Sequence, residues 1–299
     1  MFIVAVFIFA LMHVAPGGPD AFLLSDQATE AERDELRQAL GLDRTVVVQL
    51  GIWIKNIGMG DLGKSHFSGK PVLGLLIKRA APTVALAILI EIIAILVGVP
   101  LGLIAAWTRG TVTDRVIMGF ASFGFSVPGF FLGFLLIRLF ALQLGFFPAA
   151  GYVSPGENLA LFFKHLILPS ISAGLIVMAL ITRMTRASML EVLQEDYVRT
   201  ARAKGLSEYL VLSRHALRNA SLPIVTVIGI GFAGLLGGIV VIEQVFAIPG
   251  LGRLMTESIV KRDYPVIQGA IIVTSAIFVY INLLIDILYA FLDPRIKYR

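Results

Sequence analysis

Six hydrophobic runs divide the 299-residue chain, and polar stretches of unequal length separate them. They lie near residues 1–15, 83–106, 116–141, 165–189, 222–242 and 265–292. A helix that crosses the hydrocarbon core of a bilayer needs about 20 mostly apolar residues. The five later runs meet this length and the first falls short of it. The pattern predicts an all-α polytopic membrane protein with six transmembrane helices.

The first run begins at Met1 without a basic flank. A signal peptide carries positive charge before its apolar core and small residues at its cleavage site, and the sequence around Ala15-Pro16 is a poor cleavage site. We therefore expect a first span whose few basic N-terminal residues are missing from this sequence.

The longest polar stretch covers residues 17–80, between the first and second spans. Residues 29–40 begin with an N-cap signal and end before a glycine, as helices do. Residues 46–57 carry an apolar stripe at helical spacing, and residues 71–79 predict a third helix that lies along the membrane interface. We expect this stretch to form a small helical extracytoplasmic cap.

Composition and charge support the membrane assignment and give it an orientation. The chain is 57% hydrophobic and 15% charged, whereas a soluble domain has about 25% charged residues. With the N-terminus inside, the cytoplasmic segments hold twelve Lys or Arg residues and the short outer loops hold four. Cytoplasmic loops are normally the basic ones. Both termini are therefore expected in the cytoplasm, and the basic pI of about 9.6 does not indicate nucleic-acid binding.

The most basic loop lies between the fourth and fifth spans, at residues 190–221. Seven Lys or Arg residues fall between Arg183 and Arg218. Helix connections usually take about 2–8 residues, so a loop of this length is expected to have structure of its own. Residues 191–204 and 207–219 favour helix, with Gly205 as a flexible break between them. A loop that only fixes the membrane orientation remains the alternative.

The sequence gives little support for a catalytic or metal site. There is no cysteine, and the four histidines lack metal-ligand spacing. Residues 58–65 fit the phosphate-loop pattern GxxxxGK[ST], but such a loop must follow a strand and open a helix, and helical residues precede this one. Ser126 lacks the second glycine of a nucleophile elbow. We expect no enzyme, no bound cofactor and no metal site in this chain.

Charged residues and helix breakers inside the spans are candidates for a transport pathway. Charges in the bilayer usually face protein or water, and Glu91, Arg138, Glu243 and Asp286 could line a pathway or only join helices. Pro128 removes a backbone donor and should bend the third span. The pore or gate candidates are Ser126, Pro128, Gly129 and Glu91, with glycines of the fifth span, Gly229, Gly231, Gly234, Gly237 and Gly238. Close helix packing explains such glycines equally well.

Short motifs along nearly the whole chain resemble the inner-membrane permease subunits of bacterial ABC importers, in the dipeptide, oligopeptide and nickel branch. They are Pro16-Gly17-Gly18-Pro19, Gly60-Asp61-Leu62-Gly63, Pro100-Leu101-Gly102, Ser126-Val127-Pro128-Gly129, Phe147-Pro148-Ala149-Ala150-Gly151-Tyr152, Glu243-Gln244-Val245-Phe246 and Asp293-Pro294-Arg295. Each is weak alone, and their order over six spans makes them specific.

The resemblance implies that the basic loop is the coupling helix that docks on a cytoplasmic ATPase. Aligned on Gly205, the three positions of the family's EAA signature are Arg199, Thr200 and Ala201, so its Glu and first Ala are absent. Tyr197, Ala201 and Leu206 are expected to face the ATPase, with Arg202 and Lys204 at the rim. The full set of implied coupling residues is Tyr197, Arg199, Thr200, Ala201, Arg202, Lys204, Gly205 and Leu206.

The implied function is one half of a translocation pore in the bacterial inner membrane, working by alternating access. Its expected partners are a second permease, two ATPase subunits that bind ATP and Mg²⁺, and an extracytoplasmic binding protein that delivers substrate. The resemblance favours di- or oligopeptides without fixing the substrate. A secondary, ion-coupled transporter is the alternative, although no inverted repeat is evident. An intramembrane enzyme is disfavoured because no catalytic constellation is seen.

Overall fold

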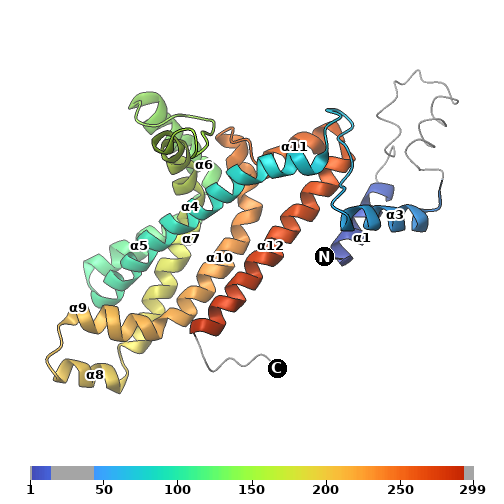
Figure 1. Cartoon of the computed structure of the whole chain (residues 1–299). Helices are drawn as coiled ribbons and strands as arrows, with labels where there is room; N and C mark the ends of the chain where they lie inside the picture. The colour runs from blue at the N-terminus through green and yellow to red at the C-terminus, as the bar shows by residue number, and fades with distance from the viewer. Residues whose placement is uncertain (1, 15–43, 293–299) are drawn as a thin grey trace. The chain divides into compact units, whose positions relative to one another are not determined.

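The computed structural model describes residues 2–14 and 44–292, and nearly all of them lie in helices (Figure 1). The elements in chain order are α1 Phe2–Val14, α3 Val46–Gly58, α4 Val72–Trp107, α5 Val112–Ser126, α6 Gly129–Leu136, η1 Ile137–Gln143, α7 Leu159–Val192, α8 Asp196–Ala203, α9 Glu208–Leu210, η2 Val211–Ala216, α10 Leu217–Val245, α11 Leu251–Lys261 and α12 Tyr264–Leu292. The all-α prediction is confirmed for the described residues.

Two compact units share these elements. The first comprises Met1–Ala81 and Gly250–Val279, and the second comprises Pro82–Pro249 and Tyr280–Arg299. Both α4 and α12 contribute residues to each unit.

In the first unit, the initial turns of α4 pack with α11 and α12. Val72 and Leu76 share a buried cluster with Leu251, Leu254 and Val266. A loop before α4 is fixed to the α11–α12 turn, because the Ser65 hydroxyl donates to Asp263 Oδ2 over 2.6 Å and the His66 N–H donates to Oδ1 over 3.2 Å. This loop therefore has a defined conformation rather than acting as a free linker.

That loop also contains the phosphate-loop pattern of residues 58–65. It follows α3 rather than a strand, and the chain turns back on itself through an isolated bridge between Lys64 and Pro71. The next helix begins only at Val72. The Ser65 hydroxyl, which would bind Mg²⁺ in a true phosphate loop, is engaged by Asp263.

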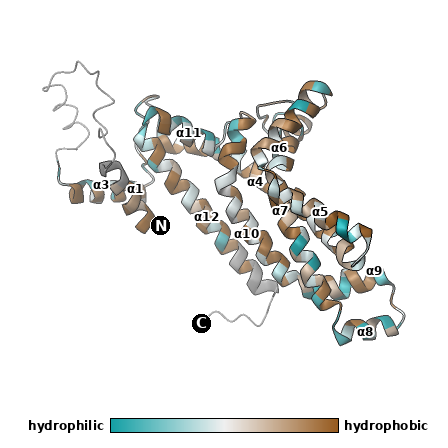
Figure 2. Cartoon of the chain, turned by 180° about the vertical axis from the view of Figure 1, so that it is seen from behind, coloured by the Kyte–Doolittle hydropathy of each residue, from teal (hydrophilic) through white to brown (hydrophobic). Residues whose placement is uncertain are grey.

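The second unit is built around α7, with α4, α5 and α10 against it. Its main buried cluster takes Leu86 and Ile90 from α4, Ile181 from α7, and Ile239 and Phe246 from α10 and its end. Burying a large apolar side chain is worth about 1.5–3 kcal/mol when water is the alternative. Hydrophobic residues recur along the long helices (Figure 2). Many of their large hydrophobic side chains are exposed, which suits a lipid environment rather than water.

Glycines let α4 approach α7 closely. A Cβ atom on Gly98 would lie 2.9 Å from the Met178 carbonyl oxygen, and one on Gly102 would lie 2.5 Å from the Thr185 Cβ. Real side chains do not approach so near, so both positions require glycine unless the helices separate. The small residues here serve packing, as they commonly do between membrane helices.

By length and composition, three described helices could cross a membrane: Val72–Trp107, Leu159–Val192 and Tyr264–Leu284. Two bent pairs bring the number to five if each pair is one span, Val112–Ser126 with Gly129–Gln143, and Glu208–Phe232 with Gly237–Val245. The predicted run at residues 1–15 corresponds to α1, a helix of 13 residues. The described residues thus support three to five spans, and the predicted count of six is not confirmed.

The smaller predicted helices differ in outcome. The helix at 46–57 is confirmed as α3, whereas the helix predicted at 29–40 lies outside the described residues. Residues 72–79 are helical but form the beginning of α4 rather than a separate helix. Pro82 does not end that helix, although a proline inside a helix removes one backbone hydrogen bond.

Candidate functional site

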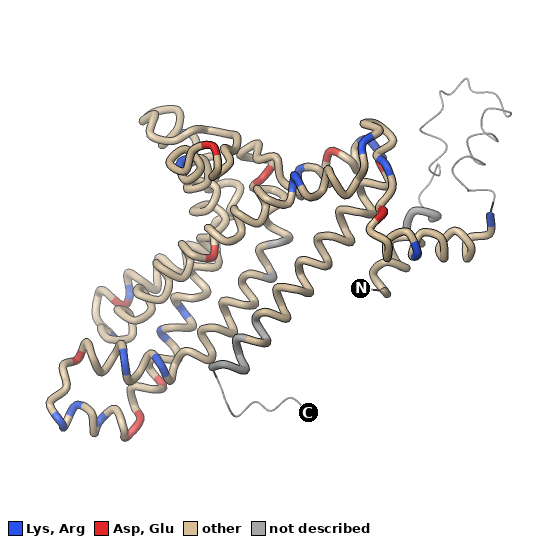
Figure 3. Tube along the Cα trace, in the orientation of Figure 1, with Lys and Arg blue, Asp and Glu red and all other residues tan. Residues whose placement is uncertain are grey.

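The basic segment, residues 190–221, is folded and carries a dense set of Lys and Arg residues (Figure 3). The predicted helix at 191–204 is wrong in its extent, because α7 continues to Val192 and a turn separates it from α8. The predicted helix at 207–219 does not end before the fifth span either, because α9, η2 and α10 follow one another without interruption. Leu222 and Pro223 consequently lie inside α10.

Gly205 makes the turn between α8 and α9, as the sequence predicted. Its φ of 77° lies in the left-handed region, and its N–H donates to the Arg202 carbonyl over 2.9 Å. Left-handed backbone costs an ordinary residue roughly 1–2 kcal/mol and costs glycine almost nothing. A Cβ atom at this position would meet no atom of the chain within 4 Å. Glycine is therefore required at position 205 by its backbone conformation. It is not required by neighbouring atoms, because the space beside position 205 is open.

One side of α8 is anchored to its own chain. Val198 and Ala201 are buried with Val211, and Val192 and Leu193 pack against them. Ala201 is only 7% exposed. The expectation that Ala201 faces a partner directly is therefore wrong, because its side chain already belongs to the interior that holds α8 in place.

The other predicted residues lie on the accessible side of the segment. The exposed residues among them are Tyr197, Arg199, Thr200, Arg202, Lys204, Gly205 and Leu206. The Tyr197 hydroxyl accepts a hydrogen bond from Asn219 Nδ2 over 2.7 Å, which fixes the ring to the beginning of α10. Tyr209 is 77% exposed and was missed by the sequence reasoning. It adds an aromatic ring to an accessible surface that otherwise carries mostly polar and basic groups.

An ion pair braces the turn at Gly205. The Arg202 guanidinium donates to both carboxylate oxygens of Glu208, through Nη2 over 2.7 Å and Nε over 3.2 Å. The hydrogen bond to Glu208 raises the pKa of Arg202 above its ordinary value. A second pair, Arg199 with Asp196 at 3.3 Å, is far more exposed. Because Arg202 serves the turn, Arg199 and Lys204 are the more available cations for a partner.

The third predicted span is broken rather than merely bent. The axes of Val112–Ser126 and Gly129–Gln143 differ by 102°, and Val127 and Pro128 between them are extended. The missing N–H of proline and the bias against helix in the residue before it explain the break. The predicted kink at residues 126–129 is confirmed, and its role in a pathway stays a prediction.

An apolar hollow of about 450 Å³ lies beside this break, and its lining residues all have apolar side chains or none. It is bounded by Phe125 and Phe130 on either side of the break, by α7, and by α10. Four of the predicted pathway glycines line it, and they are Gly129, Gly231, Gly234 and Gly238. Ser126, Pro128, Gly237 and Glu91 are not among its lining residues.

The predicted pathway glycines in and near the hollow are of two kinds. A Cβ on Gly231 would lie 2.9 Å from Val177 Cγ1, and one on Gly129 would lie 3.0 Å from the Ser172 carbonyl oxygen. At Gly234, Gly237 and Gly238 a Cβ would meet nothing within 4 Å. The first two glycines allow close helix packing, whereas the other three leave space along α10.

The predicted intramembrane charges have different surroundings. Glu243 is buried and accepts a hydrogen bond from the Thr83 hydroxyl over 2.5 Å, which joins α10 to α4. Glu91 is 7% exposed, and neither carboxylate oxygen has a hydrogen-bond partner among the described residues. Arg138 is exposed in η1, and the side chain of Asp286 is not described. Glu243 thus has the structural role left open by the sequence.

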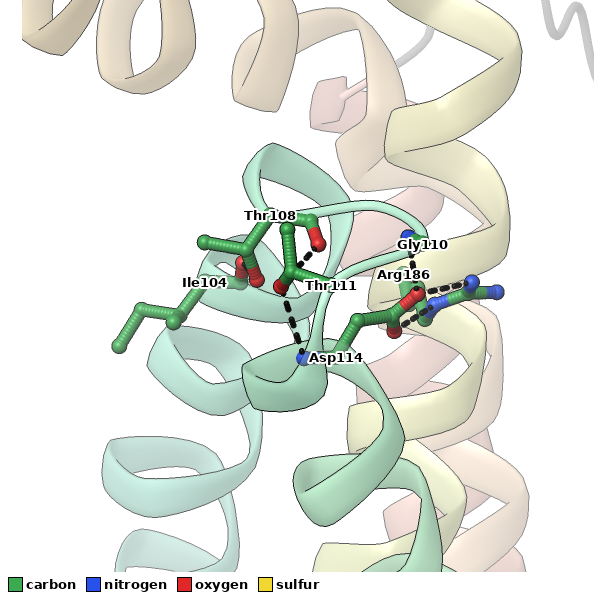
Figure 4. Close-up of polar contacts among 6 residues, drawn as sticks. All are labelled: Ile104, Thr108, Gly110, Thr111, Asp114 and Arg186. Atoms are coloured by element: carbon green, nitrogen blue, oxygen red, sulfur yellow. Dashed lines mark hydrogen bonds and ion pairs between the residues drawn. The ribbon is translucent and has the colours of Figure 1, made fainter.

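A two-point ion pair in the second unit was missed by the sequence reasoning (Figure 4). Arg186 of α7 donates from Nε and Nη2 to the two carboxylate oxygens of Asp114, over 2.7 and 2.8 Å. The Gly110 N–H donates to the same carboxylate over 3.0 Å, and Thr111 caps the beginning of α5. The contact joins residues 72 positions apart, so no local spacing in the sequence reveals it.

No group of three or more His, Asp or Glu residues that could hold a metal ion occurs within residues 2–14 and 44–292. The Ser65 hydroxyl is already engaged by Asp263. The candidate sites among the described residues are therefore the exposed surface of the basic segment and the helix-lined hollow.

Comparison with known proteins identifies the family. Residues 98–298 match the family described as binding-protein-dependent transport system inner membrane component. A probable peptide ABC transporter permease protein of Sinorhizobium fredii is 46% identical over all of this chain and 95% of its own length. A glutathione transport system permease protein of Escherichia coli K12 is 44% identical with the same coverage.

Among solved structures, an inward-facing MetNI methionine ABC transporter chain superposes with a TM-score of 0.62 and 18% identity. The match covers 74% of this chain and 97% of that one, and it supports the helical fold. The basic segment, the broken third span and the apolar hollow all lie within the matched residues 98–298. This chain belongs to the family of inner membrane components of binding-protein-dependent transport systems.

Proposed function

We propose that this chain is the permease subunit of an ATP-driven ABC importer and forms one half of its translocation pore. A second permease subunit completes the pore, two ATPase subunits bind ATP and Mg²⁺ on the cytoplasmic side, and an extracytoplasmic binding protein delivers the substrate. With one more span than the five that the described helices allow, both termini lie in the cytoplasm. The family membership and the relatives that match over all of this chain and 95% of their own length support this assignment.

The basic segment is the surface on which the ATPase docks. The observation that carries this assignment is the two-sidedness of α8. Val198 and Ala201 hold the helix to its own chain, while Arg199 and Thr200 of the same helix and Lys204 just after it are exposed. A helix held by its own chain on one side and by a partner on the other transmits displacement, and its exposed charges steer the partner into register. Leu206 and Tyr209 supply the apolar contacts that interfaces concentrate near their centres.

The substrate is a small peptide. The relatives that are about 45% identical over the whole chain are named for peptide transport and for glutathione, which is itself a tripeptide. The apolar hollow beside the third-span break belongs to the moving part of the pathway. Open space at Gly234 and Gly238 gives α10 room to approach or leave the break as the pore alternates between its two openings.

The test is purification of a tagged form of this chain from its own membrane, followed by reconstitution with its binding protein in liposomes. The expected preparation contains a second permease and an ATPase, and it takes up labelled di- or tripeptide only when ATP is supplied. Uptake driven by an ion gradient without ATP would instead establish the secondary transporter. A preparation that hydrolyses ATP but prefers a metal complex or a sugar would overturn the peptide assignment alone.

A further inference from the structure

The ion pair between Asp114 and Arg186 is built as a rigid connection. The Asp114 side chain is 6% exposed and the Arg186 side chain 25% exposed. Both carboxylate oxygens and two guanidinium nitrogens take part, and a backbone N–H adds a third donor. A two-point contact of this kind fixes orientation as well as distance. The first turn of α5 therefore cannot rotate or slide on α7 without breaking hydrogen bonds.

The opposite end of α5 is fixed to the same helix by packing. A Cβ on Gly124 would lie 3.0 Å from the Ala179 Cβ and 3.2 Å from the Leu175 carbonyl oxygen. Position 114 meets 186 and position 124 meets 179, so the two helices run antiparallel and touch over most of α5. Close-packed interiors transmit displacement instead of absorbing it. Helix α5 consequently moves with α7 as one body.

The two helices end at the two candidate functional sites. Six residues after Arg186, α7 ends at Val192, inside the basic segment. The helical rise of roughly 1.5 Å per residue makes this a distance of about 9 Å. In the other direction, α5 ends at Ser126, where the third span breaks and the apolar hollow begins. A displacement of the basic segment thus has a continuous, stiff route to the break.

We propose that the Asp114–Arg186 ion pair is a positioning contact of the transport cycle, which makes α5 follow α7 and so transmits movement of the docked basic segment to the third-span break. This rests on the proposed function, since it presumes that an ATPase moves the basic segment. In this role the pair acts through α5 and α7 and needs no contact with the substrate or the ATPase. It determines how much of the partner's movement reaches the pathway.

A purely structural role predicts a different behaviour of the same variants. If the pair only stabilised the fold, its loss would reduce the amount of assembled complex, and each complex that remained would import as much substrate per ATP as before. A positioning role lowers the substrate imported per ATP within complexes that assemble normally. The ratio of uptake to ATP hydrolysis, measured per assembled complex, separates the two.

The experiment uses the complete reconstituted complex and a background with one cysteine. The chain has no native cysteine, so Ser126→Cys places a single thiol of this chain at the break, where Ser126 is exposed. Asp114→Asn keeps the size of the side chain and removes its charge, and Arg186→Lys keeps the charge and removes the two-point geometry. Glu257→Gln is the matched control, because it weakens an ion pair of 2.9 Å with Arg253 inside a single helix, α11.

We expect Asp114→Asn to lower uptake per ATP about tenfold, within the range known for residues that couple two sites, and to reduce the change in thiol labelling at position 126 between nucleotide states. Glu257→Gln should alter neither quantity. If Asp114→Asn does not assemble, Arg186→Lys decides by the same two readouts. The proposal would be overturned if uptake per ATP and thiol labelling stayed at the level of the Ser126→Cys background. It would also be overturned if the variant formed fewer complexes but each complex imported as much substrate per ATP as before. A background complex that imports without ATP would instead overturn the proposed function, and this inference with it.

Discussion

Two ion pairs, one formed before Val192 in the sequence and one after it, have the same length but differ in solvent exposure. Arg186–Asp114 and Arg202–Glu208 both measure 2.7 Å. The first joins two helices with an aspartate side chain that is 6% exposed, whereas the second spans one turn of the basic segment with side chains 41% and 36% exposed. Breaking a buried pair leaves a charge without a partner or water, whereas an exposed pair exchanges its partner for water at little cost.

Two glycines repeat the same contrast. Gly102 faces the Thr185 Cβ so closely that an added methyl group would lie 2.5 Å from it, while Gly205 faces open space with a φ of 77°. The first glycine is required by its neighbours and the second by its own backbone. Before Val192, contacts between helices determine which residues fit in the second unit. After Val192, the backbone conformation of the basic segment determines the residue, and the surface outside it is not covered by the chain. That division is what a subunit needs if it is to be moved by a partner.

The largest expected difference lies between the two ion pairs. Asp114→Ala should destabilise the chain by about 3 kcal/mol, since it leaves the partly buried Arg186 without its carboxylate. Glu208→Ala should cost less than about 1 kcal/mol. Thermal unfolding of the two purified variants checks this, and equal shifts in melting temperature would remove the contrast between the two regions.

The next largest difference concerns helix packing. Gly102→Ala should cost about 2 kcal/mol, because overpacking forces α4 away from α7. The matched control is Gly119→Ala on α5, where an added Cβ meets nothing within 4 Å. That change should be neutral or stabilising by up to about 1 kcal/mol, from the better helix propensity of alanine. Comparable losses for both variants would show that the close approach at Gly102 does not limit stability.

A smaller effect is expected in the apolar hollow. Gly234→Leu places a side chain into open space that lines the hollow, and it should lower peptide uptake about tenfold, equivalent to about 1.4 kcal/mol. Gly237→Leu on the same helix also enters open space but does not line the hollow, and its reduction should be smaller. If Gly237→Leu lowered uptake more than Gly234→Leu, the surface of α10 that moves in transport would not be the one that lines the hollow.

The smallest expected effect is the removal of a charge from the rim of the basic segment. Lys204→Ala should change ATPase affinity by no more than about 1 kcal/mol at low salt, and by less at high salt, because exposed pairs are weak and screened. The measurement is binding of the isolated ATPase to the reconstituted permease at two ionic strengths. A large loss that is insensitive to salt would show that Lys204 is buried in the interface.

The sequence predicted the features that depend on local chemistry. Hydrophobic runs indicated the long helices, Pro128 the break in the third span, and Gly205 the turn between α8 and α9. The number of spans could not be obtained in this way, since runs of similar composition form single helices, bent pairs or the short α1.

Features that depend on which helices meet could not be predicted. Asp114 reads as an ordinary first-turn acid of a helix, and Arg186 as one of many basic residues, until α5 and α7 are placed together. Ala201 fits a signature position and so suggests a partner contact, but the side of α8 on which it lies is decided by packing against Val211. Likewise, sequence cannot say which glycines of α10 meet a neighbour and which face open space.

The most direct test of the account is to measure ATP hydrolysis and peptide uptake together in a reconstituted Gly205→Trp complex. Inside the chain a Cβ at this position meets nothing within 4 Å, so a Trp acts on a docked partner and on the backbone. Gly205→Asn is the control for the backbone, since Asn tolerates the left-handed conformation better than other residues. We expect near-normal transport with Asn. With Trp we expect an assembled complex whose uptake is lost or whose ATP hydrolysis no longer drives uptake. If the Trp complex matches the unsubstituted one in both activities, the basic segment does not transmit the ATPase movement and serves only to orient the chain in the membrane.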